Sequence, residues 1–453
     1  MMHSFPHHAF REYDIRGIAG TDITDDFAYR LGKAFAVKLP KHESRAISVG
    51  RDVRISGKAL QAAVMRGLTD AGVDVIDIGM GPTPSAYYSV FHLDTGGCIM
   101  VTASHNPGEY NGFKLMLGKE SLHGENIQHL KDLMQQDIEN AEHSGAIAQV
   151  DINTDYANFV VADCPLSRPL KVVIDAGNGP SGILAAPIYR RMGCEVIELY
   201  CQPDGSFPNH HPDPTIAENM FDLAAKVCES KADLGIAFDG DGDRIGIVDE
   251  QGHIIWGDML LLILARQLLK RHPHATVISE VKSSENMYAG IRQAGGNPIM
   301  WRTGHSPIKA KMKETGALLA GEMSGHMFFA DRFFGFDDAI YAGARVMQVL
   351  ADSHGLLSEQ LHDVPHTEIT PELRINCPDK RKFNVVEEAK AYFSAHGYHI
   401  IDVDGMRIQF EDGWGLLRAS NTQPALVLRF EAPSKQRLKH MRDLISGWLD
   451  QHL

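Results

Sequence analysis

The chain has 453 residues and a net charge of −14, and 44% of its residues are hydrophobic. This length exceeds one ordinary hydrophobic core, so we expect about three or four domains. The negative charge disfavours a nucleic-acid-binding function, because such proteins usually meet phosphate backbones with a basic surface. The six cysteines show no CxxC spacing, which favours a reducing, cytoplasmic location over a disulfide framework or a zinc site.

Neither the N-terminus nor the interior predicts a membrane segment. The first 17 residues carry several charges and no apolar core, unlike a secretory signal. The most apolar run, residues 259–265, is bounded by Asp258 and Arg266, whereas a membrane span needs about 20 apolar residues. We expect this run to be part of a buried helix.

Short β-rich apolar runs alternate with amphipathic helical stretches over most of the chain, a pattern typical of α/β domains. Strands are predicted at residues 46–49, 73–78 and 97–101, and the pattern restarts at 171–175 and 276–279. Three similar units indicate duplication. We expect their sheets to be mixed.

The last part of the chain has a different pattern. Predicted strands at 373–376, 406–410 and 415–418 combine with a helix at 383–395 and a closing helix into a smaller α+β domain. The expected linker is near residues 363–371. The predicted domains are 1–150, 151–253 and 254–365, all α/β, and 366–453, which is α+β.

Residues 102–107, Thr-Ala-Ser-His-Asn-Pro, place a serine hydroxyl where an apolar strand gives way to a turn. Active sites of α/β proteins tend to lie at such strand ends. Ser104 is therefore a candidate nucleophile, although serine is also common in turns that have no catalytic role. The adjacent His105 is poorly placed as a triad partner, which disfavours a serine hydrolase.

Three carboxylates at alternate positions, Asp239, Asp241 and Asp243, follow the apolar strand at 235–238. In an extended strand they would lie about 6.6 Å apart, so the backbone must curl for them to bind one ion, and the intervening glycines allow this. Three oxygen ligands favour Mg²⁺. A calcium-binding EF-hand loop is the alternative, with Glu250 at its last position, but Arg244 stands where that loop requires glycine.

Residues 177–182 match the G-x-G-x-x-G pattern of dinucleotide-binding proteins, with Glu198 about twenty residues further on. Pro180 occupies the position where a pyrophosphate-binding helix would begin. We therefore favour a tight strand-to-helix turn over a dinucleotide site.

Three further polar loops follow apolar runs, at residues 304–307, 321–326 and 418–424. The last offers a guanidinium, hydroxyls and turn amides suited to a phosphate dianion. The second offers a carboxylate, a hydroxyl and an imidazole suited to vicinal sugar hydroxyls. The phosphate candidates are Arg418, Ser420, Asn421 and Thr422, and the sugar candidates are Glu322, Ser324 and His326.

Taken together, these motifs resemble the α-D-phosphohexomutase family in kind and in order, over nearly the whole chain. The resemblance is carried by residues 102–107 continuing into 110–114, and by residues 239–244, 321–326 and 418–424. Residues 10–17 are similar to the N-terminal signature of the family. The Gly-Glu-Met-Ser-Gly-His form of the sugar loop resembles bacterial phosphomannomutase/phosphoglucomutase more than phosphoglucosamine mutase.

The resemblance implies four domains around a central cleft and an isomerase that acts as an intramolecular phosphotransferase. Such an enzyme interconverts the 1-phosphate and 6-phosphate of mannose or glucose. It implies that Ser104 is carried as phosphoserine, and that hexose 1,6-bisphosphate is both the intermediate and the activator. Mg²⁺ would be held by Ser104, Asp239, Asp241 and Asp243.

The resemblance also implies roles for further residues. His305 is the candidate general base, His105 would orient the phosphoserine, and Arg244 and Lys114 would stabilise the transferring group. The implied substrate contacts are Tyr13, Arg16, Lys282, Glu322, Ser324, His326, Arg418, Ser420, Asn421 and Thr422.

Three alternatives stay open: a phosphoglucosamine mutase, a Mg²⁺-dependent sugar phosphatase and a non-catalytic sugar-phosphate-binding protein. In each case the expected partners are small-molecule sugar phosphates, with no nucleic acid and no membrane. We expect a cytoplasmic protein that is a monomer or a weak homodimer.

Overall fold

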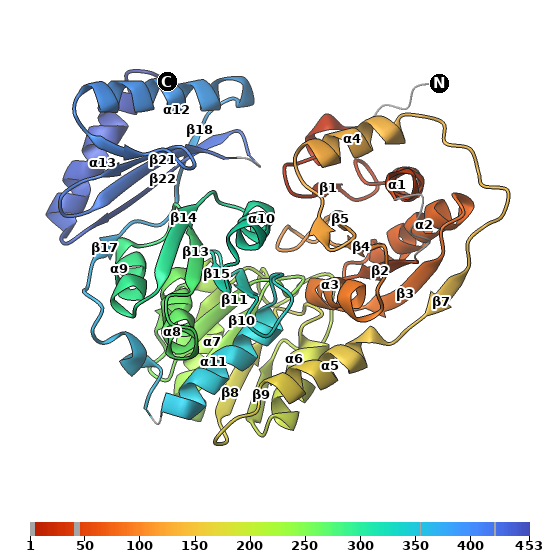
Figure 1. Ribbon diagram of the computed structural model, residues 1–453, viewed down its shortest axis with the longest axis horizontal. Coiled ribbons are helices and arrows are strands. Elements are labelled where there is room, and N and C mark those ends of the chain that lie inside the picture. Colours follow the sequence, from red (N-terminus) through yellow and green to blue (C-terminus); the bar gives the residue numbers. More distant parts are fainter. Residues whose placement is uncertain (1–4, 40–45, 354, 421–422) are drawn as a thin grey trace. The chain divides into compact units, whose positions relative to one another are not determined.

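The computed structural model describes residues 5–39, 46–353, 355–420 and 423–453 (Figure 1). Within it the chain forms two compact units. Unit 1 contains residues 1–264 and 324–360, and unit 2 contains residues 265–323 and 361–453. Among the described helices, none has the length and apolar character that a bilayer crossing requires.

The first sheet of unit 1 is mixed. Strand β2 runs parallel to β3 and β4, whereas β5 runs antiparallel to both β4 and β1. This order brings the end of β4 beside the start of β5, where the segment of Ser104 connects them. In sheet order the strands are β1 Ile15–Ile18, β5 Tyr110–Leu117, β4 Gly97–Val101, β2 Ile47–Arg51, β3 Val75–Met80 and β7 Ile147–Gln149, and β6 Glu120–Ser121 pairs with β5.

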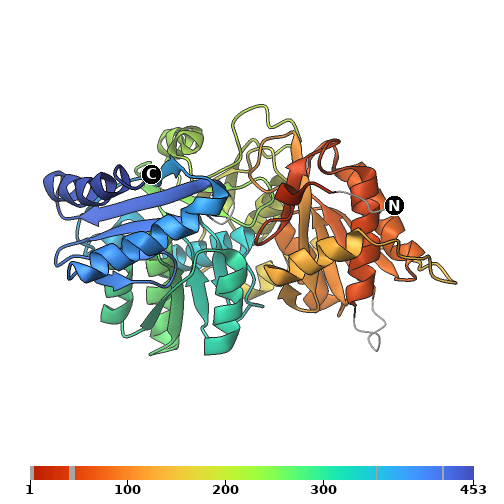
Figure 2. The same ribbon diagram turned by 90° about the horizontal axis from the view of Figure 1, so that it is seen from above.

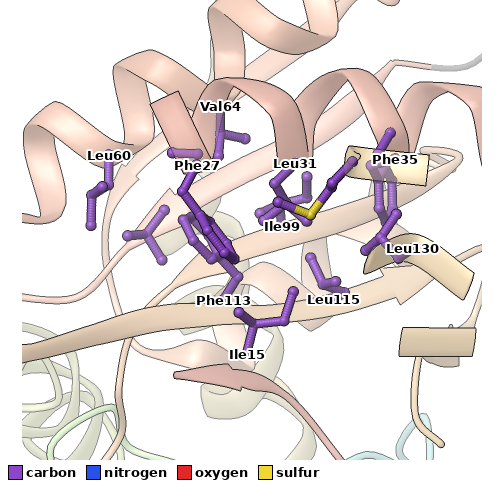
Figure 3. Close-up of a cluster of buried hydrophobic side chains, with 14 of the residues drawn as sticks. Ile15, Phe27, Leu31, Phe35, Leu60, Val64, Ile99, Phe113, Leu115 and Leu130 are labelled. Carbon is purple, nitrogen blue, oxygen red and sulfur yellow. The ribbon is translucent and has the colours of Figure 1, made fainter. Parts of the chain in front are cut away.

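The core of this domain lies between the sheet and helices α1 (Asp25–Lys38), α2 (Gly57–Asp70) and α4 (Glu125–Met134). Figure 3 shows Phe27 of α1 against Phe113 of β5. The two helices α1 and α2 pack so closely at Gly67 that a Cβ atom there would overlap the carbonyl oxygen of Tyr29. Helix α3 (Thr83–His92) also packs against the sheet, through β2 and β4.

The second sheet of unit 1 is also mixed, with β8 parallel to β9 and β10, and β11 antiparallel to β10. Its strands β10 and β11 flank the predicted carboxylate loop. The order is β12 Ile254–Ile255, β11 Ile245–Asp249, β10 Leu234–Phe238, β8 Lys171–Asp175 and β9 Glu195–Leu199. The helices that pack on or beside this sheet are α5 Ile152–Asp163, α6 Gly182–Arg191, α7 Phe221–Ser230 and α11 Ala339–Ser353.

The G-x-G-x-x-G segment at residues 177–182 is the turn between β8 and α6. Unit 1 also contains η1 His7–Ala9, η2 Ala217–Met220 and β16 Met327–Phe329, and η3 Ser358–Leu361 begins within its last residues. Helix α8 (Gly257–Arg271) contains the predicted apolar run and is buried along most of its length.

Unit 2 contains two sheets. In the first, β13 runs parallel to β14 and β15, and α9 and α10 pack beside them. The second is antiparallel, and helices α12 and α13 cover it (Figures 1 and 2). The bounds in the first group are β13 Thr276–Glu280, α9 Glu285–Gln293, β14 Asn297–Trp301, α10 His305–Thr315 and β15 Leu319–Gly321.

The strands of the C-terminal sheet are, in sheet order, β17 Glu368–Ile369, β22 Ala425–Ala432, β21 Trp414–Ala419, β20 Met406–Gln409 and β19 His399–Ile401, with β18 Leu373–Asn376 on β22. Its helices are α12 Asp379–Ala395 and α13 Lys435–Leu449. The expected linker at residues 363–371 is not a plain connection, because it contains β17, which pairs with β22.

The predicted fold class, three α/β domains followed by a smaller α+β domain, is confirmed by the four sheets and their helices. The boundaries of the four domains stay a prediction, because the chain divides by compactness into only two units.

Candidate active site

Ser104 follows β4 in a strained backbone conformation. Its φ of 50° lies in the left-handed region, which non-glycine residues rarely adopt outside sites that hold them there. The side chain is buried, and its hydroxyl donates a hydrogen bond of 2.8 Å to Asp239 Oδ2. His105 Nδ1 lies 3.1 Å from the same hydroxyl oxygen. The serine oxygen is therefore directed at the carboxylate loop of the neighbouring sheet.

Arg16, on β1, contacts the same segment. Its guanidinium donates to the carbonyl oxygen of Ala103 (3.3 Å) and to Asn106 Oδ1 (2.8 Å), and it forms an ion pair of 2.6 Å with Asp14. Tyr13 lies two residues before β1 in the same domain. The structure therefore places Arg16 beside Ser104.

The carboxylate loop curls in the way that metal binding requires. Asp239 Oδ1 accepts backbone N–H bonds of 3.0–3.1 Å from Gly242, Asp243 and Arg244, and Gly242 has a φ of 77° that favours glycine. Oxygen atoms of Asp239, Asp241 and Asp243 lie within 4.8 Å of one another, and all three residues are fully buried. The loop connects two strands, which excludes the EF-hand alternative.

Lys114, on β5, reaches into the carboxylate cluster. Its ammonium donates to Asp241 Oδ2 (2.6 Å) and to Asp243 Oδ2, and Thr83 Oγ1 donates to Asp241 at 2.5 Å. Burial opposes the charge of Lys114, yet the two carboxylates raise its pKa above the ordinary value. Burial also opposes ionisation of Asp241, but Lys114 lowers its pKa below the ordinary range.

The carboxylate cluster fits a hard divalent cation. Asp241 Oδ1 and Asp243 Oδ1 are buried and accept no hydrogen bond from any described residue. The pKa of Asp239 is raised well above its ordinary value by burial and by the charges of Asp241 and Asp243. A bound Mg²⁺ would offset this repulsion and use the two unpaired oxygens as ligands.

Arg244 and His326 form a second group beside the carboxylates. Arg244 Nε donates to His326 Nε2 at 3.0 Å, and His326 Nδ1 lies 3.0 Å from Asp337 Oδ2. Burial opposes protonation of His326, but Asp243 and Asp337 raise its pKa above the ordinary value. Ser324 lies on the same loop, before β16. Sequence reasoning missed Asp337, for which the only signal was the paired Asp337-Asp338 after an aromatic run.

Two predicted site residues of unit 2, Glu322 and His305, lie close together. Glu322 Oε1 accepts a hydrogen bond of 2.6 Å from the backbone N–H of Gly304, next to His305. The prediction of a loop at residues 304–307 was wrong, because His305 is the first residue of α10. Pro307 lies in the first turn of this helix, where its missing N–H is not needed.

Two of the phosphate candidates of unit 2, Arg418 and Ser420, are engaged in an ion pair and a hydrogen bond. Arg418 lies in β21 and contacts Asp404 Oδ2 at 3.0 Å, and Ser420 Oγ accepts the backbone N–H of Gln423 at 3.1 Å. Asn421 and Thr422 lie outside the described residues.

Lys282 contacts Glu372 at 2.6 Å and Glu280 at 3.4 Å. The attraction of Lys282 lowers the pKa of Glu372 to about 2. Lys282 is itself buried, so its two carboxylate partners hold the ammonium group in place inside unit 2.

Sequence reasoning also missed Arg429, a buried cation on β22. Its Nε and Nη1 atoms have no hydrogen-bond partner among the described residues. The available signal was the pair of charged residues, Arg429 and Glu431, inside the largely apolar strand Ala425–Ala432.

Comparisons with known proteins identify the family of the chain from four segments between residues 7 and 447. Family profiles described as phosphoglucomutase/phosphomannomutase match four consecutive segments. The profile of alpha/beta/alpha domain I matches residues 7–141, that of domain II matches 154–252, and that of domain III matches 256–367. The profile of the C-terminal domain matches residues 372–447.

Two curated relatives are similar over nearly their full lengths. The chain is 46% identical to a phosphoglucomutase of Neisseria gonorrhoeae, covering 100% of this chain and 98% of the relative. It is 44% identical to a phosphomannomutase/phosphoglucomutase of Pseudomonas aeruginosa, covering 98% and 96%.

A crystal structure of a phosphoglucomutase/phosphomannomutase family protein from Burkholderia thailandensis superimposes with a TM-score of 0.91 at 42% identity, covering 97% of this chain and 96% of that one. The chain therefore belongs to the phosphoglucomutase/phosphomannomutase family.

Proposed function

We propose that the protein is a phosphohexomutase, which interconverts hexose 1-phosphates and hexose 6-phosphates. The observation that carries the proposal is the buried Ser104 hydroxyl, which donates to Asp239 of the carboxylate cluster in a chain of this family. The close relatives named above support mannose and glucose phosphates as the substrates.

In the proposed reaction Ser104 begins as phosphoserine. A free hydroxyl oxygen of the bound hexose phosphate attacks the phosphorus and gives its proton to a base, while the Ser104 Oγ–P bond breaks and Ser104 Oγ takes up a proton. The resulting hexose 1,6-bisphosphate reverses its orientation in the site and returns its other phosphate to Ser104. The phosphate count is unchanged, so the net reaction is an isomerisation.

The roles of the residues in unit 1 follow from their positions. Mg²⁺ held by Asp239, Asp241, Asp243 and a phosphate oxygen on Ser104 would neutralise charge on the transferring group. Lys114 fixes Asp241 and Asp243 and supplies positive charge next to them. Burial and nearby cations hold the pKa of His105 well below the ordinary value, so its neutral imidazole orients the serine oxygen.

Further predicted residues are proposed to bind the substrate. Arg244 would contact the transferring phosphate, and Tyr13 and Arg16 would contact the sugar phosphate near Ser104. Glu322, Ser324 and His326 would bind sugar hydroxyls, and His305 is the proposed general base. The non-transferring phosphate would be bound by Lys282, Arg418, Ser420, Asn421 and Thr422.

The proposal is tested by coupled assays of mannose 1-phosphate, glucose 1-phosphate and glucosamine 1-phosphate with Mg²⁺ and a trace of glucose 1,6-bisphosphate. We expect isomerisation of the first two and a requirement for the bisphosphate as activator. Ser104→Ala should nearly abolish activity, whereas Ser230→Ala, at the end of α7, should retain it. Normal activity of Ser104→Ala would refute the proposal.

The same assays separate the alternatives. A sugar phosphatase would release inorganic phosphate instead of isomerised sugar phosphate, and a phosphoglucosamine mutase would turn over glucosamine 1-phosphate fastest. A binding protein would show no turnover while Ser104→Ala kept ligand affinity. Light scattering of the purified chain tests the predicted monomer or weak homodimer.

A further inference from the structure

The segment that carries Ser104 is held by an arginine from outside it. Arg54 lies between β2 and α2, and its side chain is fully buried. An arginine has five N–H donors, and here all five have acceptors. Nε donates to Asp52 Oδ2 at 3.2 Å. The other four donate to backbone carbonyl oxygens of Ser104 (2.7 Å), Asn106 (2.5 Å), Pro107 (2.6 Å) and Tyr110 (2.8 Å).

Arg54 therefore organises the whole turn between β4 and β5. Backbone carbonyl oxygens need a hydrogen-bond partner, and in a turn that leaves the sheet they lose their ladder partners. One planar guanidinium satisfies four of them and fixes their spacing. A lysine at this position would keep the charge but offers only three donors without a planar fork.

A second path of hydrogen bonds runs from Arg54 through Asp52 and Thr102 to the backbone N–H of Ser104. Asp52 Oδ1 accepts the backbone N–H of Arg54 at 2.9 Å, and Asp52 Oδ2 accepts Thr102 Oγ1 at 2.7 Å. Thr102 Oγ1 in turn accepts the backbone N–H of Ser104 at 2.9 Å. Arg54 and Asp52 thus fix both polar backbone groups of Ser104, the residue with the left-handed φ of 50°.

We infer that Arg54, with Asp52 and Thr102, is a positioning residue for phosphoryl transfer. It acts through the Ser104 backbone, which directs Ser104 Oγ at Asp239, and it has no donor left for a substrate. The inference rests on the proposed function. Because Arg54 offers no donor to the substrate and its loss misplaces the reacting oxygen, loss of Arg54 affects kcat and leaves KM largely unchanged.

The test compares Arg54→Lys with wild type, using Lys58→Arg on the exposed side of α2 as a control. We expect kcat to fall about 100-fold in Arg54→Lys, the loss that a misplacement of about 1 Å produces, with KM changed less than about threefold. Phosphorylation of Ser104 by glucose 1,6-bisphosphate, followed by intact mass, should slow by the same factor. Amide hydrogen exchange of residues 104–110 should accelerate.

A second pair of variants decides the question if Arg54→Lys does not fold. Thr102→Val removes the hydroxyl between Asp52 and Ser104 at nearly constant volume, and Thr102→Ser restores it. We expect kcat to fall at least about 10-fold in Thr102→Val and to recover to within about threefold of wild type in Thr102→Ser.

Each of three outcomes overturns the inference. The first is a kcat of folded Arg54→Lys within about threefold of wild type, and the second is a rise in its KM as large as the fall in its kcat. The third is equal activity of Thr102→Val and Thr102→Ser. Inactivity of the wild-type chain would instead refute the proposed function, so the two failures are distinguishable.

Discussion

Gly240 is the residue of the carboxylate loop that packs against the segment of Ser104, and the contact leaves no room for a side chain. A Cβ atom built at this position would overlap the carbonyl oxygen of Ser104 and lie 3.2 Å from Pro212 Cγ. Carbon–oxygen contacts are tolerated from about 3.3 Å, so Gly240→Ala must move the two loops apart by about 1 Å.

This displacement lengthens the path between Ser104 and the carboxylates of Asp239, Asp241 and Asp243. A misplacement of about 1 Å can cost about 100-fold in rate, and overpacking of this kind costs about 1–3 kcal/mol of stability. We therefore expect Gly240→Ala to fold with a kcat about 100-fold below wild type.

The assay is the coupled isomerase assay at saturating Mg²⁺ and glucose 1,6-bisphosphate, with thermal unfolding measured in parallel. Gly447→Ala is the matched control, because Gly447 lies in α13 with no atom within 4 Å of a built Cβ. Alanine should stabilise that helix by about 0.5–1 kcal/mol and leave kcat unchanged. A folded Gly240→Ala protein with the kcat of wild type would refute the close packing of the two loops.

Three further predictions address the metal site and two ion pairs. Asp241→Asn removes a proposed metal ligand, so kcat/KM should fall at least about 100-fold and the Mg²⁺ titration should shift to higher concentration; an unchanged titration contradicts the assignment. Burial opposes protonation of His210, but Asp175 at 2.9 Å raises its pKa, so its stabilising effect is present below about pH 6.5 and lost as pH rises through the raised value. The loss of thermal stability in His210→Gln should therefore be larger at pH 6 than at pH 8.5, and an equal loss at both would refute this. Lys282 lowers the pKa of Glu372 to about 2, so Lys282→Met should cost about 3 kcal/mol at pH 7, a cost that shrinks as pH falls from about 4.5 towards 2, as chemical unfolding would show.

The fold was predictable where the signal is local. The apolar run at residues 97–101 followed by a turn predicted β4 and the position of Ser104, because strands and turns depend on short-range preferences. The left-handed backbone of Ser104 was not predictable, since residues distant in the chain such as Arg54 and Gly240 impose it.

Charged residues that become buried were the hardest to interpret from the sequence. Asp52 and Arg54 follow a strand in a polar stretch that resembles a solvated loop, and only the fold shows that both are buried. His305 was placed in a loop because glycine, serine and proline surround it, although proline fits the first turn of a helix. The carboxylate triplet was recognisable because three acidic side chains so close in sequence repel one another unless a cation offsets their charge.

Ser104 is proposed to store a phosphate and to transfer it to a sugar. The most direct measurement incubates the chain with glucose 1,6-bisphosphate labelled with ³²P, maps the labelled peptide, and then adds unlabelled glucose 6-phosphate. We predict that the label attaches to Ser104 and leaves as hexose bisphosphate on addition of the sugar phosphate. Label on another residue, or its release mainly as inorganic phosphate, would contradict the claim.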